Sequence, residues 1–217
     1  ACNRIHAGEI KSNRVCTIDK LNLLYILESN LIDSKFYINI SSAWNSVIEL
    51  AGSSSTNKNE LMLEGNLFEN INANKEMNIS NYIDAVANKG FVKISVIGNI
   101  FKYGRRTMTL SLPAVIKGNE IIGCYYAPIY INASGTSLDN QVSVIESNIF
   151  ELTNYRMDSS YIIYAQTGFP MVLLNNTYFT KTLNSGDLEN ISYTPTSWYN
   201  TTPSNLTEAN NNIVSLS

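Results

Sequence analysis

One short phrase recurs six times along this chain and constrains its fold more than any other feature. It reads Φ-x-[GSN]-N-x-Φ, where Φ is a large apolar residue, and we call it the rung phrase. Its asparagines are Asn30, Asn66, Asn99, Asn119, Asn148 and Asn176. Successive copies lie 20 to 36 residues apart. A shared phrase at such a period indicates a solenoid, in which each repeat is one structural unit.

The residues around the rung phrases alternate between apolar and polar with period two, as β-strands do. Residues 92–96 (VKISV) show this alternation before a phrase, and residues 129–133 (IYINA) and 161–165 (YIIYA) show strand character between phrases. This period, together with the Ile, Val, Tyr and Thr content, excludes a helical solenoid. Leucine-rich repeats need a tighter leucine spacing, and propeller blades need longer repeats. We therefore expect a β-solenoid with more than one strand per repeat.

These phrases resemble those of the right-handed parallel β-helix, the pectin-lyase-like superfold, over residues 23–182. The resemblance implies coils of two or three short strands, a stack of asparagine amides at one turn, and interior stacks of Phe, Ile and Leu. An amide carries both donors and acceptors, so identical side chains can bond along such a stack. The expected fold is all-β: a single-stranded right-handed parallel β-helix (solenoid) in residues 1–183. An extended Ser/Thr/Asn-rich arm is expected in residues 184–217.

The composition narrows the class of partner. Charged residues make up 15% of the chain, against roughly 25% in ordinary soluble domains, and about one residue in seven is asparagine. The net charge is −3 and no basic patch occurs, so no nucleic-acid partner is expected. No apolar run approaches ~18 residues, so no membrane-spanning helix is expected. The chain begins at Ala1 rather than Met, which predicts a mature or trimmed chain whose missing signal peptide does not argue against secretion.

Seven Asn-x-Ser/Thr sequons predict N-glycosylation. Their acceptors are Asn39, Asn78, Asn132, Asn175, Asn190, Asn200 and Asn205. A chain this rich in Asn, Ser and Thr yields roughly five sequons at random, so their placement matters more than their number. None of the six ladder asparagines is an acceptor, as an interior stack requires, and three acceptors crowd residues 190–205. We expect a secreted extracellular or cell-surface glycoprotein with covalent N-linked glycans and no cofactor.

Candidate catalytic residues are sparse. Glycoside hydrolysis needs two carboxylates at a set separation, and Glu28, Glu64 and Glu146 each stand two residues before a ladder asparagine. Other repeats have Ile, Lys and Leu at this position, which favours a solvent-facing column over a catalytic pair. The patterns typical of polygalacturonases and pectate lyases do not occur. No catalytic residues are therefore predicted.

The cysteines and the single histidine give little material for a metal site. Cys2 and Cys16 could close a short N-terminal loop through a disulfide, and Cys124 is then left as a buried thiol or an intermolecular bond. His6 is the only histidine and no C-x-x-C occurs, so no metal site is expected.

The favoured function is a structural subunit of an extracellular filament. A β-helix has two open ends, and the segment 213–216 could add as a strand to a neighbouring copy, giving head-to-tail assembly with itself as partner. The alternative is a carbohydrate-binding adhesin or tailspike-like domain, with Trp198-Tyr199 and Tyr125-Tyr126 as sugar-stacking pairs. A polysaccharide lyase or hydrolase is the third and least favoured hypothesis.

Overall fold

The fold was obtained as a computed structural model, which describes just over half of the chain. The described residues are 10–11, 15–18, 24–26, 29–38, 46–50, 59–72, 81–85, 91–104, 106–110, 114–124, 127–131, 142–151, 161–165, 170–181, 197–200 and 206–216. Every strand pair in these residues is parallel. The chain is therefore an all-β protein built from stacked parallel strands, as the rung phrases predict.

The strands form three sheets of eight, eight and seven members. Sheet A contains β1 (Ile10–Lys11), β4 (Ser29–Ile32), β7 (Asn59–Glu64), β10 (Phe91–Ile97), β13 (Ala114–Lys117), β16 (Ser143–Glu146), β19 (Met171–Leu174) and β22 (Leu206–Ala209). Sheet B contains β2 (Val15–Ile18), β5 (Lys35–Ile38), β8 (Leu67–Asn70), β11 (Ile100–Lys102), β14 (Glu120–Ile122), β17 (Ile149–Glu151), β20 (Thr177–Lys181) and β23 (Asn212–Leu216). Sheet C contains β3 (Leu24–Ile26), β6 (Ser46–Leu50), β9 (Asn81–Ala85), β12 (Arg106–Leu110), β15 (Ile129–Ile131), β18 (Tyr161–Ala165) and β21 (Ser197–Tyr199).

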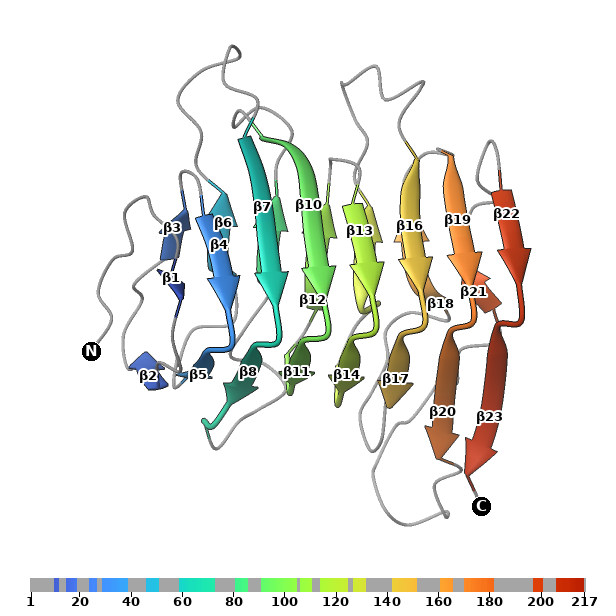
Figure 1. The fold of residues 1–217 in the computed structure, drawn as a ribbon. Coiled ribbons are helices and arrows are strands. Elements are labelled where there is room, and N and C mark those ends of the chain that lie inside the picture. The colour runs from blue at the N-terminus through green and yellow to red at the C-terminus, as the bar shows by residue number, and fades with distance from the viewer. Residues whose placement is uncertain are drawn as a thin grey trace.

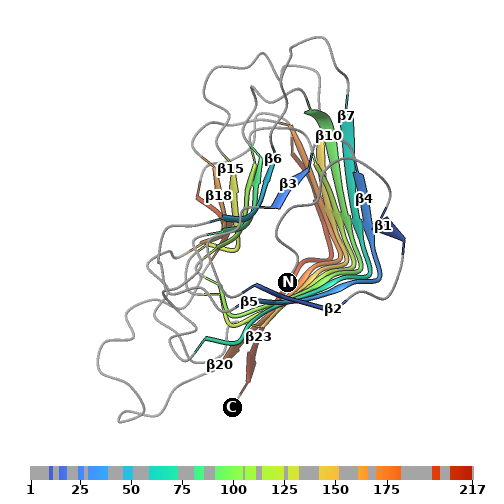
Figure 2. The same ribbon diagram turned by 90° about the vertical axis from the view of Figure 1, so that its left-hand side faces the viewer.

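The chain passes from sheet A to sheet B to sheet C and back, so each circuit is one coil of a solenoid. Coil 1 is β1, β2 and β3, coil 7 is β19, β20 and β21, and coil 8 contributes β22 and β23 in the described residues. Figure 1 shows the strands of sheet A side by side in chain order. Figure 2, seen along the stack, shows the coils superposed with the three sheets as the sides of one cross-section.

The corner between sheets A and B explains the small residue of the rung phrase. The residue before the ladder position has positive φ in seven successive coils: Asp33 (48°), Gly65 (67°), Gly98 (61°), Gly118 (63°), Ser147 (56°), Asn175 (55°) and Asn210 (56°). This left-handed conformation is costly for most L-residues and is tolerated best by Gly, Asn and Asp. The sequence column [GSN] therefore records a backbone requirement of the corner.

The interior consists of side chains stacked from coil to coil. In sheet B one column is formed by Phe36, Phe68, Phe101, Ile121, Phe150 and Tyr178. In sheet A the aliphatic column is Leu63, Val96, Ile116, Ile145 and Leu173, and sheet C adds Ile48, Ile83, Met108, Ile129 and Ile163. All of these side chains are at most 2% exposed. Burying an aliphatic or aromatic side chain of this size contributes ~1.5–3 kcal/mol each, so these columns are the main source of stability.

The division into a solenoid of residues 1–183 and an arm of residues 184–217 is wrong for the described part of the arm. β21 pairs with β18, β22 with β19, and β23 with β20, so these strands complete coil 7 and begin coil 8. The segments 184–196 and 201–205 lie outside the described residues. The low aliphatic content of this segment suggested an arm outside the solenoid. Parallel pairing of β22 and β23 depends on main-chain hydrogen bonds more than on apolar side chains, so the segment can still form strands of the solenoid.

Candidate functional site

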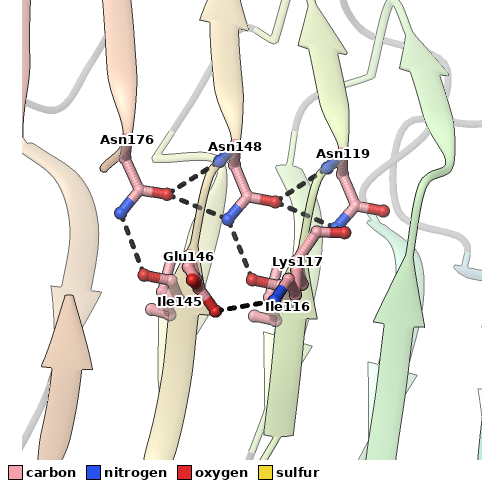
Figure 3. A network of polar contacts seen from close by, with 7 residues as sticks. All are labelled: Ile116, Lys117, Asn119, Ile145, Glu146, Asn148 and Asn176. Atoms are coloured by element: carbon pink, nitrogen blue, oxygen red, sulfur yellow. Dashed lines mark hydrogen bonds and ion pairs between the residues drawn. The ribbon is translucent and has the colours of Figure 1, made fainter. Parts of the chain in front are cut away.

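A ladder of asparagine side chains runs along the corner between sheets A and B. The Nδ2 atoms of Asn66, Asn99, Asn119, Asn148 and Asn176 each donate to the Oδ1 atom of the next ladder asparagine, the last to Asn211, at 2.9 to 3.1 Å. The same Oδ1 atoms also accept the main-chain N–H of the preceding ladder residue at 2.9 to 3.0 Å. The central part of the ladder is shown in Figure 3.

Each ladder amide also holds the neighbouring coil through its main chain. Asn148 Nδ2 donates to Ile116 O at 2.9 Å, and Asn176 Nδ2 donates to Ile145 O at 2.9 Å, as Figure 3 shows. Asn66, Asn99, Asn119, Asn148 and Asn176 are at most 1% exposed. Buried polar groups of this kind must be satisfied, and the ladder satisfies donor and acceptor of every internal member. The rung phrase therefore describes a structural device.

Five of the six predicted ladder asparagines occupy the ladder, and Asn30 does not. Asn30 lies inside β4, opposite Met62. The ladder position of that coil is taken by Ser34, whose main-chain N–H donates to Asn66 Oδ1 at 3.0 Å. Asn211 is a further member that the phrase missed.

The carboxylates that were considered as a catalytic column lie on the outer face of sheet A. Glu64, Ile97, Lys117 and Glu146 follow one another by register in successive coils. Lys117 Nζ lies 3.0 Å from Glu146 Oε2, and both side chains are accessible. An exposed pair of this kind is worth ~0–1 kcal/mol. The residue of coil 2 in this column is Ile32, and Glu28 lies outside the described residues.

The aromatic residues considered for sugar stacking are placed differently. Trp198 is 8% exposed, and its ring meets Phe150 edge-on at a centroid distance of 5.9 Å. It therefore packs in the interior and offers no open ring face, which corrects the sugar-stacking role predicted for it. On the outer face of sheet C, Tyr130 and Tyr164 stack at 5.3 Å and Arg106 covers the Tyr130 ring at 4.2 Å. Tyr125 and Tyr126 lie outside the described residues.

Two of the seven predicted glycosylation acceptors fall within the described residues. Asn175 is exposed at the positive-φ corner, next to the buried Asn176, and its Oδ1 accepts a hydrogen bond from Asn210 Nδ2 at 3.1 Å. Asn200 is half-buried, and its main-chain N–H donates to Ile163 O at 3.3 Å. The acceptors Asn39, Asn78, Asn132, Asn190 and Asn205 lie outside the described residues.

Two of the three cysteines, Cys16 and Cys124, fall within the described residues. Cys124 is a buried thiol that is not part of a disulfide, and Thr107 Oγ1 donates to its Sγ at 3.9 Å. Cys16 is in β2, opposite Phe36 by register, whereas Cys2 and His6 lie outside the described residues. Within the ranges given above, no three His, Cys, Asp or Glu residues lie together in a way that could hold a metal ion. The described part of the chain also has no helix long and apolar enough to cross a membrane.

Coil 8 differs from the internal coils in the residues that occupy the inward-facing positions of its strands. Glu208 follows Leu173 in the aliphatic column of sheet A, and Ile213 follows Tyr178 in the aromatic column of sheet B. Loss of hydration, the charge of Glu208 and a hydrogen bond to that carboxylate raise the pKa of Tyr199 above its usual value. Ile213 and Val214 are 40% and 37% exposed. The coil 8 end thus combines a polar Tyr199–Glu208 pair with two accessible apolar side chains.

The buried Tyr178 hydroxyl is expected to lower the free energy of unfolding in alkaline solution. Burial, and secondly the neighbouring Cys124, raises the pKa of the Tyr178 hydroxyl far above its usual value. A tyrosine whose pKa is higher in the folded than in the unfolded state makes its full contribution to stability below about pH 10, the ordinary tyrosine pKa. This contribution is lost as the pH rises further. We expect Tyr178→Phe to flatten the fall in unfolding free energy above about pH 10, measured by urea unfolding at several pH values. An unchanged slope in a variant with native circular dichroism would show that Tyr178 is not the group responsible.

Comparison of the chain with protein-family models, with curated proteins and with solved structures returns no match to any of them. The function is therefore inferred from the residues and geometry of this chain.

Proposed function

We propose that this chain is a structural subunit of a secreted, N-glycosylated extracellular filament, built as a right-handed parallel β-helix and assembled head to tail with copies of itself. The observation that carries the proposal is the exposed edge of coil 8. Among the described residues, β22 pairs with β19 and β23 with β20, and neither has a strand on its other side. An open parallel edge presents main-chain donors and acceptors that another strand can satisfy.

The side chains of coil 8 support addition of another coil. Ile213 continues the column of buried aromatic and aliphatic residues, yet it is 40% exposed because no described coil covers it. At the other end, Ile10 in β1 lies in register with Leu31 in coil 2, so β1 is the first described strand of sheet A and has a strand on one side only. A contact between unlike ends does not close on itself and therefore generates a filament.

Glu208 makes this end selective. A charged residue that points inward at a sheet edge opposes indiscriminate pairing, and it is one of the devices by which β-proteins limit aggregation. Glu208 stands where the internal coils have aliphatic residues, and it bonds to Tyr199 across the end. A partner coil must match the apolar side of coil 8 and leave room for this polar pair.

The exposed acceptor Asn175 supports the extracellular part of the proposal. It lies at the outside of a corner, whereas the adjacent ladder asparagine is fully buried. A glycan on such a residue would project from the solenoid without entering its core. The glycans would then coat the sides of the filament and leave the ends free to pair.

The assembly can be tested with a matched pair of isoleucine substitutions. Ile213→Lys places a charge at the coil 8 end, and Ile149→Lys places the same charge on the outer face of sheet B at a similar exposure of 44%. We expect the parent chain and Ile149→Lys to form filaments in electron micrographs and large species in sedimentation. Ile213→Lys should remain monomeric. A parent chain that stays monomeric at high concentration, or equal behaviour of the two variants, contradicts the proposal.

A further inference from the structure

The ladder shows a constant arrangement of donors at every internal coil. Each ladder asparagine directs two hydrogen-bond donors, its main-chain N–H and its Nδ2, onto the single Oδ1 of the next coil. For Asn148 these two donors lie 3.0 Å and 3.0 Å from Asn176 Oδ1. For Asn176 they lie 3.0 Å and 2.9 Å from Asn211 Oδ1. Two donors that converge on one oxygen form a binding site for a hydrogen-bond acceptor, and the fold fixes the geometry of this site.

Asn211 has the same side-chain placement as the internal members. Its Oδ1 accepts both donors of Asn176, and its Nδ2 donates to Leu173 O at 2.8 Å, as Asn176 Nδ2 donates to Ile145 O at 2.9 Å. The main-chain N–H and second Nδ2 hydrogen of Asn211 therefore point where the ladder oxygen of a ninth coil would lie. No acceptor for either donor is found among the described residues, and Asn211 is half-buried.

We propose that these two donors of Asn211 form a socket for a side-chain amide oxygen of a second copy of the chain, so that the ladder continues across the contact between subunits. This inference rests on the proposed head-to-tail assembly and names the residue-level chemistry of that contact. An amide or carboxylate oxygen fits two converging N–H groups, whereas an ammonium or guanidinium group, which has donors only, does not. The socket thus selects both the partner and its register.

A second copy offers a suitable oxygen at its opposite end. The segment from Ile10 to Val15 reads IKSNRV, a further match to the rung phrase beside the six copies named above, with Asn13 at the place of the ladder asparagine. Its flanking parts are β1 and β2, the strands of coil 1 that would meet β22 and β23. Asn13 itself lies outside the described residues, so its assignment uses its place in the sequence between β1 and β2. The occupant that matches the socket is therefore coil 1 of another copy.

The socket can be tested with a pair of isosteric substitutions. Asn211→Asp keeps the oxygen that accepts from Asn176 but replaces the Nδ2 donor by a second oxygen that repels the incoming acceptor. Asn212→Asp introduces the same charge one residue later, on an exposed side chain whose Nδ2 donates to Asn210 O at 3.2 Å. We expect Asn211→Asp to weaken association about tenfold or more, since a buried hydrogen bond replaced by repulsion has at least this effect. Asn212→Asp should assemble as the parent does.

Mixing two defective chains gives a result that misfolding cannot imitate. Asn13→Leu retains the socket but lacks the oxygen, and Asn211→Asp retains the oxygen but lacks the socket. Each alone should stay monomeric, and an equimolar mixture should form heterodimers that do not extend, detected by sedimentation or native mass spectrometry. If the parent assembles and Asn211→Asp assembles equally well, the socket is wrong while head-to-tail assembly stands. If the parent never assembles, the proposed function fails and the socket with it.

Discussion

Replacing Asn148 by leucine is expected to lower the free energy of unfolding by at least about 4 kcal/mol. The substitution removes four hydrogen bonds, from the main-chain N–H and Nδ2 of Asn119, the carbonyl of Ile116 and the Oδ1 of Asn176. Asn119 Nδ2 keeps its bond to Val96 O, and Asn176 Oδ1 keeps the main-chain N–H of residue 148. All four lost bonds are buried and contribute ~0.5–1.5 kcal/mol each, and a buried donor left without its acceptor, as the main-chain N–H of Asn119 is, costs up to ~3 kcal/mol. Leucine branches at Cγ as asparagine does and is larger, so the substitution leaves no cavity and the effect reports mainly the lost hydrogen bonds.

The measurement is urea unfolding of Asn148→Leu beside Asn212→Leu. Asn212 follows the ladder position in coil 8 and is exposed, so its replacement should change the unfolding free energy by about 0.5 kcal/mol or less. Hydrogen exchange should show the loss of protection centred on coils 5 to 7, because in a solenoid each coil contacts only its neighbours. If both variants lose the same small amount, the ladder serves only to fix the corner and the stability lies in the apolar columns.

The parallel solenoid could be predicted from sequence because two structural requirements restrict the residue type at fixed positions of the repeat. The corner needs a positive φ, which limits the residue before the ladder to Gly, Ser, Asn or Asp in the described coils. The ladder needs an amide with donor and acceptor, which limits the next residue to asparagine in six successive coils. These restrictions are local, so they survive in the sequence even though the loops between coils vary in length.

The errors in the ladder occurred where a coil departs from these restrictions. In coil 2 the corner is Asp33-Ser34, and the nearby Ser29-Asn30 matched the phrase by chance because Leu27 and Ile32 happen to flank it. In coil 8 the phrase failed at Glu208, which stands where an aliphatic residue was required. One deviation is in the last described coil and the other in the second, so the repeat is most regular in coils 3 to 7.

The features proposed for function could not be read from any single repeat. The socket proposed at Asn211 rests on a side chain that keeps the geometry of the internal ladder members at the last described coil. The burial of Trp198 depends on Phe150, which is distant in sequence and comes close through the register of sheets B and C. Such contacts are set by coil stacking, which the rung phrase predicts only in outline.

Replacing Phe68 by alanine should lower the free energy of unfolding by roughly 4–8 kcal/mol. Phe68 is fully buried and stacks on Phe36 at 4.9 Å and on Phe101 at 5.1 Å, with interplanar angles of 12° and 5°. A buried Phe→Ala change costs ~3–5 kcal/mol through lost burial and the cavity. Each lost aromatic contact adds ~0.5–1.5 kcal/mol. Urea unfolding monitored by circular dichroism measures the total.

The column itself supplies the control for this substitution. Ile121 occupies the same position in coil 5 and is fully buried, so the stack accepts an aliphatic residue where a phenylalanine is usual. Phe68→Leu should therefore cost much less than Phe68→Ala, about 1–2 kcal/mol, because it keeps most of the buried volume and loses mainly the ring contacts. If leucine and alanine cost the same, the stability of this column comes from the aromatic stacking rather than from filled volume. The tolerance for Ile121 would then have to come from its neighbours in coil 5.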